Sequence, residues 1–358
     1  MEGTKEKKTF KGFLERQNIK ISAKTYFVDA MGSMALGLFA SLLIATIFET
    51  LGGWFSWQFL IDAAGFAKNA TGAALGVAIA YSLKAPPLVL LSAAAVGMAG
   101  NGLGGTFIMN GKELVLTAGP AGAFVAAVIA VELGKLVSKT TKVDILVTPT
   151  VTILSGVAIA KLVCPSIAWL MYQLGNFVNT ATVMQPFIMG ILVSVVVGMV
   201  LTLPISSAAL CAMIGITGIA GGAATVGCCA QMVGFAVISF RENRWGGLVA
   251  QGLGTSMLQM GNIIRRPIIW IPPTLAAAIC GPISTMVFKL ECTGVAAGMG
   301  TCGLVGPIGV VSDMGVTTNS IVGIAAVCIL LPAVLSLLFS EIMRKLGWIR
   351  ENDMLLEL

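Results

Sequence analysis

The amino-acid sequence predicts an all-α polytopic membrane protein. Three observations lead to this prediction: a low charge content, several long apolar runs, and apolar segments interrupted by glycine. Hydrophobic residues make up 57% of the chain and charged residues 11%, and the mean hydropathy is +0.94. Soluble domains carry roughly 25% charged residues, so this chain cannot cover a surface that faces water. Five windows are close to the roughly 20 apolar residues that span a bilayer: Tyr26–Leu51, Leu114–Leu136, Ile145–Val163, Met184–Leu203 and Ile321–Phe339.

Charged residues separate the apolar runs and give a path for the chain. Lys135, Lys139 and Lys142 indicate one cytoplasmic loop, and Arg241 with Arg244 indicate another, because basic residues collect on the cytoplasmic side. With these loops inside, we expect about ten membrane-crossing helices. Their expected ranges are 27–50, 64–83, 86–108, 114–136, 144–163, 165–182, 184–203, 222–240, 268–289 and 317–343.

The two ends of the chain are expected on the cytoplasmic side. Residues 1–25 form a basic arm with seven Lys or Arg, and Arg344, Lys345 and Arg350 lie close to the other end. Residues 26–345 would then form one membrane transporter unit of scaffold and transport subdomains, and residues 346–358 a cytoplasmic tail. The arm is either an amphipathic helix on the membrane surface or a solvated basic tail.

Three apolar stretches are too short or too broken to cross, at residues 204–221, 245–262 and 294–312. Irregular backbone at membrane depth survives only where it is buried in protein or lines a watered cavity. Transporters place their substrate sites at such re-entrant or broken elements, often as a pair of glycine-interrupted segments in the two halves of the chain. We therefore expect re-entrant glycine-rich hairpins.

Two of the glycine-rich stretches resemble one another. Gly97–Gly105 reads GMAGNGLGG, Gly298–Gly306 reads GMGTCGLVG, and five of the nine positions are identical. A weaker similarity relates residues 148–160 to residues 272–284. The pattern indicates a two-fold internal repeat, or else a chance match in a chain rich in glycine and alanine.

The broken segments supply the candidate solute-binding residues. Unpaired backbone groups at mid-membrane cost several kcal/mol each unless a bound group satisfies them, and intramembrane acids are usually functional. The alternative is that the glycines serve only helix packing and kinks. The candidates are Asn101 and Gly102 in the first stretch, Gly300, Thr301, Cys302 and Gly303 in the second, the acids Glu291 and Asp313 that flank it, and Gln259 with Asn262 in the stretch 245–262.

Composition also excludes several classes of function. The chain has eight cysteines without a CxxC pair and no histidine, so we expect no metal site and no cofactor. Without histidine, the usual general base near neutral pH is missing, and we expect no catalytic residues and no enzyme activity. The net charge of +6 reflects topology and not nucleic-acid binding.

The pattern resembles a known family. The stretches NGLGGTFIMNGKE, LGKLVSKTTKVDILVTPT, LTLPISSAALCAMIGITGIAGGAATVGCCAQMVGF and GMGTCGLVGPIGV are similar to the integral-membrane IIC permeases of the phosphoenolpyruvate sugar phosphotransferase system. The most similar branch is named after a regulator of perfringolysin toxin expression, and the resemblance covers about residues 25–345.

This resemblance implies an elevator-type, dimeric permease in the bacterial cytoplasmic membrane, served by separate cytoplasmic phosphotransferase components. In the wider group, a glutamate and a histidine near re-entrant hairpins bind the sugar. This chain departs from that pattern, since it has no histidine and Gly298–Gly306 contains no glutamate.

Two functional hypotheses follow. In the first, the chain is a permease that carries a small polar solute, such as a sugar, by alternating access at the paired glycine-rich breaks. In the second, it is a membrane regulator that senses a solute without transporting it and signals through the basic arm. The expected partners are the solute, membrane lipid, a second copy of the chain and the phosphotransferase components.

Overall fold

The computed structural model describes residues 16–19, 22, 25–109, 112–182 and 184–356, so most of the basic arm lies outside the described residues. The described chain is mostly helical, and it contains six helices that are long and apolar enough to cross a membrane. This confirms a multi-pass membrane protein. The six spans are Met31–Gly53, Gly119–Val137, Asp144–Thr182, Gly218–Ile238, Pro267–Phe288 and Thr318–Lys345. Four shorter apolar helices accompany them: Thr71–Ser82, Pro87–Gly102, Pro186–Thr202 and Cys302–Met314.

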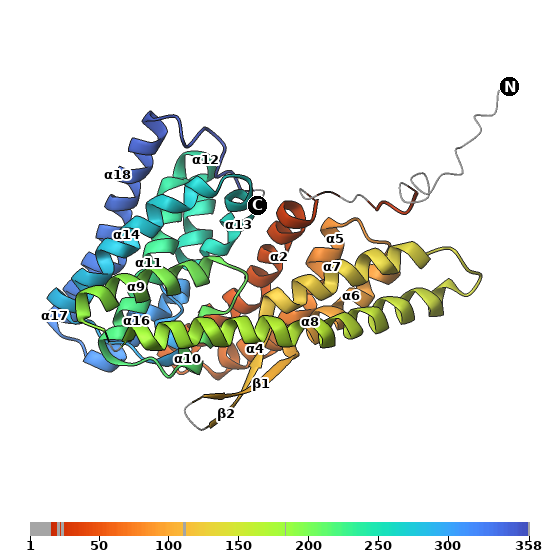
Figure 1. Cartoon of the computed structure of the whole chain (residues 1–358), viewed down its shortest axis with the longest axis horizontal. Helices are drawn as coiled ribbons and strands as arrows, with labels where there is room; N and C mark the ends of the chain where they lie inside the picture. Colours follow the sequence, from red (N-terminus) through yellow and green to blue (C-terminus); the bar gives the residue numbers. More distant parts are fainter. Residues whose placement is uncertain (1–15, 20–21, 23–24, 110–111, 183, 357–358) are drawn as a thin grey trace. The chain divides into compact units, whose positions relative to one another are not determined.

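The chain forms two compact units (Figure 1). Unit 1 comprises the described residues up to Leu38, together with Ala70–Gly105 and Thr117–Ile167, and unit 2 comprises Phe39–Asn69, Thr106–Leu116 and Ala168–Leu358. The helices of unit 1 are α2 (Met31–Leu38), α5 (Thr71–Ser82), α6 (Pro87–Gly102), α7 (Gly119–Val137) and the first part of α8 (Asp144–Thr182). A π-helical segment, Thr25–Ala30, precedes α2.

Small residues bring the helices of unit 1 into backbone contact. A Cβ atom on Gly76 would lie 2.0 Å from the carbonyl oxygen of Ala93, and one on Gly97 would lie 2.2 Å from that of Gly72. Helices α5 and α6 therefore cross at a distance that only glycine permits, which is the usual packing device of membrane helices. Helix packing therefore accounts for Gly97 in the first repeat-like stretch, whereas a Cβ on Gly102 would meet nothing within 4 Å.

A buried ion pair lies at the end of α7. The Lys135 side chain is 1% exposed, its Nζ atom lies 3.2 Å from Oε2 of Glu132, and it donates a hydrogen bond of 3.0 Å to the Leu83 carbonyl at the end of α5. We expected Lys135 to mark a cytoplasmic loop. The structure instead places it in the last turn of α7, where it satisfies the carbonyl end of a neighbouring helix.

Unit 2 is built around the buried helix α11 (Gly218–Ile238), against which α9, α14 and α18 pack. Glycine again allows two helices to pack closely, because a Cβ on Gly227 of α11 would lie 1.9 Å from the Ser194 carbonyl oxygen of α9. The helices of this unit are α3 (Ile44–Phe55), α4 (Gln58–Asn69), α9 (Pro186–Thr202), α10 (Ser207–Met213), α11, α12 (Phe240–Val249), α13 (Met260–Arg265), α14 (Ile271–Ile283), α15 (Gly294–Ala297), α16 (Val305–Met314), α17 (Thr318–Gly323) and α18 (Leu331–Lys345).

The expected crossing at 64–83 is divided between two helices, since α4 ends at Asn69 and α5 begins at Thr71. Two further sequence-based expectations about the elements are wrong. The separate crossings at 144–163 and 165–182 are one continuous helix, α8, of 39 residues with Pro165 inside it. In apolar surroundings no water replaces a lost helical hydrogen bond, so continuing the helix past the proline keeps the other backbone groups paired.

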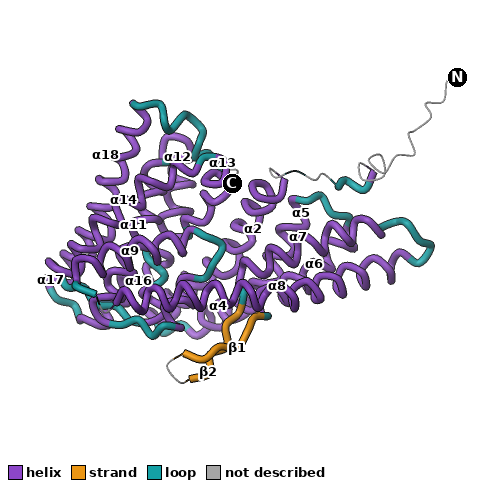
Figure 2. The backbone as a smooth tube through the Cα atoms, in the orientation of Figure 1, coloured by secondary structure: helices purple, strands orange, loops and turns teal. Residues whose placement is uncertain are grey.

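The second correction is a β-hairpin in a chain expected to be all-α. Strands β1 (Gly104–Met109) and β2 (Lys112–Thr117) form a two-stranded sheet (Figure 2), so α7 begins at Gly119 and not at residue 114. Gly119 with a φ of +59° and Pro120 in the first turn separate the strand from the helix. Tyr172 of α8 stacks on Phe107, with ring centroids 5.2 Å apart.

The three stretches expected to be broken contain short helices joined by irregular backbone. Residues 204–221 contain α10 and an extended turn before α11. Residues 245–262 contain a π-helical segment (Ala250–Gly254), a 3-10 segment (Ser256–Gln259) and the start of α13. Residues 294–312 contain α15, a turn and α16. The two repeat-like stretches differ locally, since the first ends α6 and enters a strand while the second is the turn between α15 and α16.

Candidate functional site

Two extended segments of unit 2 cross beside each other. One segment, Ile216 and Thr217, leads into α11, which begins at Gly218. The other segment, residues 290–293, leads into α15, which begins at Gly294. The Cys292 amide donates to the Gly218 carbonyl at 3.2 Å, and the Gly294 amide donates to the Ile216 carbonyl at 2.9 Å. Because each segment satisfies backbone groups of the other, irregular backbone is stable at this depth in the protein.

Glycines at the start of α11 allow this close crossing. A Cβ atom on Gly221 would lie 1.8 Å from the carbonyl oxygen of Cys292, and a Cβ on Gly222 would lie 1.8 Å from that of Leu290. Any side chain at either position would push the segment 290–292 away from the helix. The pair Gly221–Gly222 therefore fixes the place of Glu291, which lies between the two contacted carbonyls.

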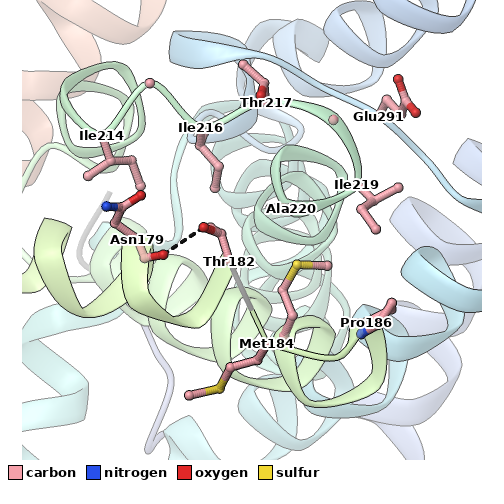
Figure 3. Close-up of a pocket in the computed structure, with 13 residues that line it drawn as sticks. Asn179, Thr182, Met184, Pro186, Ile214, Ile216, Thr217, Ile219, Ala220 and Glu291 are labelled. Carbon is pink, nitrogen blue, oxygen red and sulfur yellow. Dashed lines mark hydrogen bonds between the residues drawn. The ribbon is translucent and has the colours of Figure 1, made fainter. Parts of the chain in front are cut away.

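A cavity of about 640 Å³ lies next to this crossing, within the size range of small-molecule sites. Its polar lining comes from Asn179 and Thr182 near the end of α8, from Thr217 and from Glu291 (Figure 3). The other lining residues are Met184, Pro186, Met189, Ile214, Gly215, Ile216, Gly218, Ile219 and Ala220. Gly215 and Gly218 have φ values of +60° and +61°, which turn the chain around the cavity.

The cavity offers both hydrogen-bond donors and acceptors. Thr217 is the N-cap residue of α11, and its side chain makes no capping hydrogen bond. The first amide groups of a helix have no intrahelical acceptor and carry the positive end of the helix dipole. Glu291, which is exposed, supplies acceptor oxygens. Hydroxyl groups both donate and accept, so a hydroxylated solute matches this lining. No cluster of three or more metal-ligating side chains occurs in the described part of the chain.

Of the sequence-predicted candidates, Glu291 lines the cavity, whereas the glycine-rich turn does not. Thr301 and Cys302 are buried, 3% and 2% exposed, and the Thr301 hydroxyl lies 3.6 Å from Sδ of Met232. Gly300 and Gly303 have positive φ values, +54° and +52°, and shape the turn. Cys302 belongs to the hydrophobic core of unit 2.

Asn101 and Gly102 belong to unit 1, where they end α6. Asp313 is exposed near the end of α16 and does not line the cavity. Its neighbour Met314 contacts the crossing, since the Glu291 amide lies 3.2 Å from Sδ of Met314.

Gln259 and Asn262 hold the C-terminal tail. The Gln259 side chain donates to the Met354 carbonyl at 3.0 Å, and the Asn262 side chain donates to the Leu355 carbonyl at 2.9 Å. Both side chains are buried, and their amide groups are occupied by protein backbone.

The sequence analysis did not single out Asn179, Thr182 or Thr217. One signal was available, because the run NTATVMQP places several polar residues at the expected end of a crossing. The sequence analysis used that run only as the boundary between the expected crossings 165–182 and 184–203. The exact cavity also depends on the path of residues 214–218, which no local pattern specifies.

These features define a class of protein: a multi-pass membrane protein whose broken helices surround a polar cavity. A comparison with protein families then identifies the group. The model described as "Phosphotransferase system, EIIC" matches residues 28–356, so the chain belongs to this family and is a membrane component of sugar transport. A comparison with curated proteins finds no match.

Proposed function

We propose that the chain is a permease that binds a sugar or a related polyol in the cavity beside Glu291 and moves it across the membrane by alternating access. The observation that supports this proposal is the cavity itself, whose lining includes Glu291 and the N-terminal end of α11, where the Thr217 side chain makes no capping hydrogen bond. Family membership supports a sugar as the solute class.

Within this proposal each polar group has a role. Glu291 accepts hydrogen bonds from sugar hydroxyls. A hydrogen bond to an ionised carboxylate is stronger than one between two neutral groups. Amides at the start of α11 donate to sugar oxygens, and Thr217 with Asn179 orients the ring. Both chain ends face the cytoplasm, the protein is a homodimer, and separate cytoplasmic components phosphorylate the arriving sugar.

The test begins with a thermal-shift screen of the detergent-purified protein against monosaccharides, disaccharides and hexitols. A ligand at 100 times its Kd adds about 2.7 kcal/mol of stability. The Kd of the best ligand is then measured for three variants. Glu291→Gln should raise it roughly 10- to 150-fold, because a hydrogen bond to a charged group contributes about 1.5–3 kcal/mol.

Two acidic residues that do not line the cavity provide matched controls. Asp313→Asn and Glu113→Gln each remove one exposed carboxylate and should leave the Kd within about twofold. A Kd unchanged by Glu291→Gln, or lowered affinity in Asp313→Asn alone, would contradict the proposed site. Solute binding without uptake into vesicles would favour the sensing alternative over transport.

A further inference from the structure

A polar groove in unit 2 holds the last described residues of the chain. The Asn243 side chain donates to the Met354 carbonyl at 2.7 Å and accepts from the Leu356 amide at 2.7 Å. One side-chain amide thus pairs with a carbonyl and an amide of the tail backbone. The backbone of a neighbouring β-strand makes the same two kinds of hydrogen bond. Gln259 and Asn262 bind the Met354 and Leu355 carbonyls as described above.

The groove amides are themselves organised by a buried network. Gln251 donates to the Ser239 hydroxyl at 2.8 Å, Gln259 donates to Gln251 at 3.0 Å, and Asn262 donates to Gln259 at 2.8 Å. This chain of hydrogen bonds fixes the direction in which each amide points. The remaining donors are therefore held ready for carbonyl oxygens.

Side chains of the tail add selectivity to these backbone contacts. Met354 is completely buried in an apolar cluster that includes Phe235, Ile263 and Met343. Asp353 lies with one carboxylate oxygen 3.7 Å from Nε of Arg266. The other carboxylate oxygen of Asp353 accepts a hydrogen bond from the Arg350 amide of the tail itself. The tail thus contacts its groove through one ion pair and one buried methionine side chain.

The groove requires a hydrogen-bonding occupant. Both hydrogen bonds of the Asn243 side chain in the described part of the chain go to the tail. Gln259 and Asn262 are buried, and a buried amide that loses its partner is costly, so an empty groove would have to be filled by water or by another polypeptide. The same groove borders the irregular segment 250–262, to which Gln251, Gln259 and Asn262 belong.

We propose that this groove is a peptide-recognition site whose reversible intramolecular ligand is the tail segment Asp353–Leu356, and that the bound tail holds the broken segment 250–262 in place. Release of the tail frees that segment to move. A polypeptide that presents an acidic residue followed by methionine competes for the groove.

The first experiment supplies the tail as a separate molecule. A chain that ends at Arg350 is mixed with a fluorescent synthetic peptide of residues 350–358, and binding is followed by fluorescence anisotropy. The peptide should bind, and both Asn243→Ala in the protein and Met354→Ala in the peptide should weaken binding at least tenfold. Absence of binding to a folded truncated chain, or binding that neither substitution changes, would overturn the proposal.

The second experiment uses the full chain, so it does not depend on the truncated form. Hydrogen exchange of the Leu356 amide and of segment 250–262 is compared between the wild-type chain, Asn243→Ala and the control Asn319→Ala, whose amide binds the Phe288 carbonyl elsewhere. Asn243→Ala should accelerate exchange at both places at least tenfold, and Asn319→Ala at neither. Unchanged exchange at the tail refutes the ligand role, and unchanged exchange at 250–262 refutes the coupling. Neither readout involves a solute.

Discussion

A methyl group added at Gly221 should displace the Glu291 segment. The new Cβ would lie 1.8 Å from the Cys292 carbonyl oxygen, whereas ordinary contact begins at 3.4 Å. The segment must therefore move by about 1.6 Å, because the obstructing atom belongs to the backbone and cannot rotate away. The nearby hydrogen bond from the Cys292 amide to the Gly218 carbonyl, 3.2 Å long, would be lost or weakened.

Two consequences of Gly221→Ala can be given magnitudes. Overpacking costs about 1–3 kcal/mol and a lost hydrogen bond about 0.5–1.5 kcal/mol, so the folded state should lose about 2–4 kcal/mol. If Glu291 no longer reaches the solute, the Kd should rise roughly 10- to 150-fold. The two effects are separable, because binding is measured on the fraction that remains folded.

The assay compares thermal unfolding and solute Kd for Gly221→Ala and Gly65→Ala. Gly65 is also inside a helix, but a Cβ there meets nothing within 4 Å. Alanine at Gly65 should therefore raise stability by about 0.5–1 kcal/mol and leave the Kd unchanged. If Gly221→Ala retains the wild-type melting temperature and Kd, the argument that close backbone contact positions Glu291 is refuted.

Three further predictions concern packing and buried charge. Lys135→Ala should lower the free energy of unfolding by about 1–3 kcal/mol, because it removes the charged partner of the partly buried Glu132, which keeps its hydrogen bond to Tyr26. The double change Lys135→Met with Glu132→Leu should recover most of that loss in denaturant titrations. Gly97→Ala should destabilise unit 1 by about 1–3 kcal/mol in thermal unfolding, since its Cβ would lie 2.2 Å from the Gly72 carbonyl, whereas Gly32→Ala, with open space around it, should not. Arg344→Ala should also lower the melting temperature, because Nη2 lies 2.8 Å from Oε1 of Glu242 and both side chains are largely buried; equal melting temperatures of variant and wild type would contradict this.

The sequence predicted most of the helices because spanning segments need long apolar runs, and composition alone reports those. It also located the irregular segments, since glycine-rich apolar stretches can neither face lipid as loops nor form comfortable helices. The continuity of α8 past Pro165 was missed, because proline usually ends a helix in water but less often in an apolar environment. The hairpin was missed because residues 104–117 are apolar enough to pass for parts of two crossings.

The candidate site was harder to predict than the fold. Glu291 was identified because an acid beside a broken apolar segment is unusual. Gln259 and Asn262 have the same signature, yet their partner is the backbone of a tail about 95 positions away, and a local pattern does not reveal such a contact. Thr301 looked like a solute ligand for its polarity, although a hydroxyl can also be accommodated in a core by a sulfur neighbour. A polar residue in a broken apolar segment is therefore important, but the sequence does not show whether its partner is a solute, the backbone or another side chain.

The position of the solute can be tested most directly by cysteine protection. All eight native cysteines are buried, so a single Thr217→Cys substitution at the cavity adds one thiol that a hydrophilic maleimide reaches. Val316→Cys, 77% exposed in the native chain and outside the cavity lining, serves as the control. We predict that the ligand with the largest thermal shift slows labelling at residue 217 at least tenfold and leaves labelling at residue 316 unchanged. Equal labelling of residue 217 with and without that ligand would show that the solute binds elsewhere.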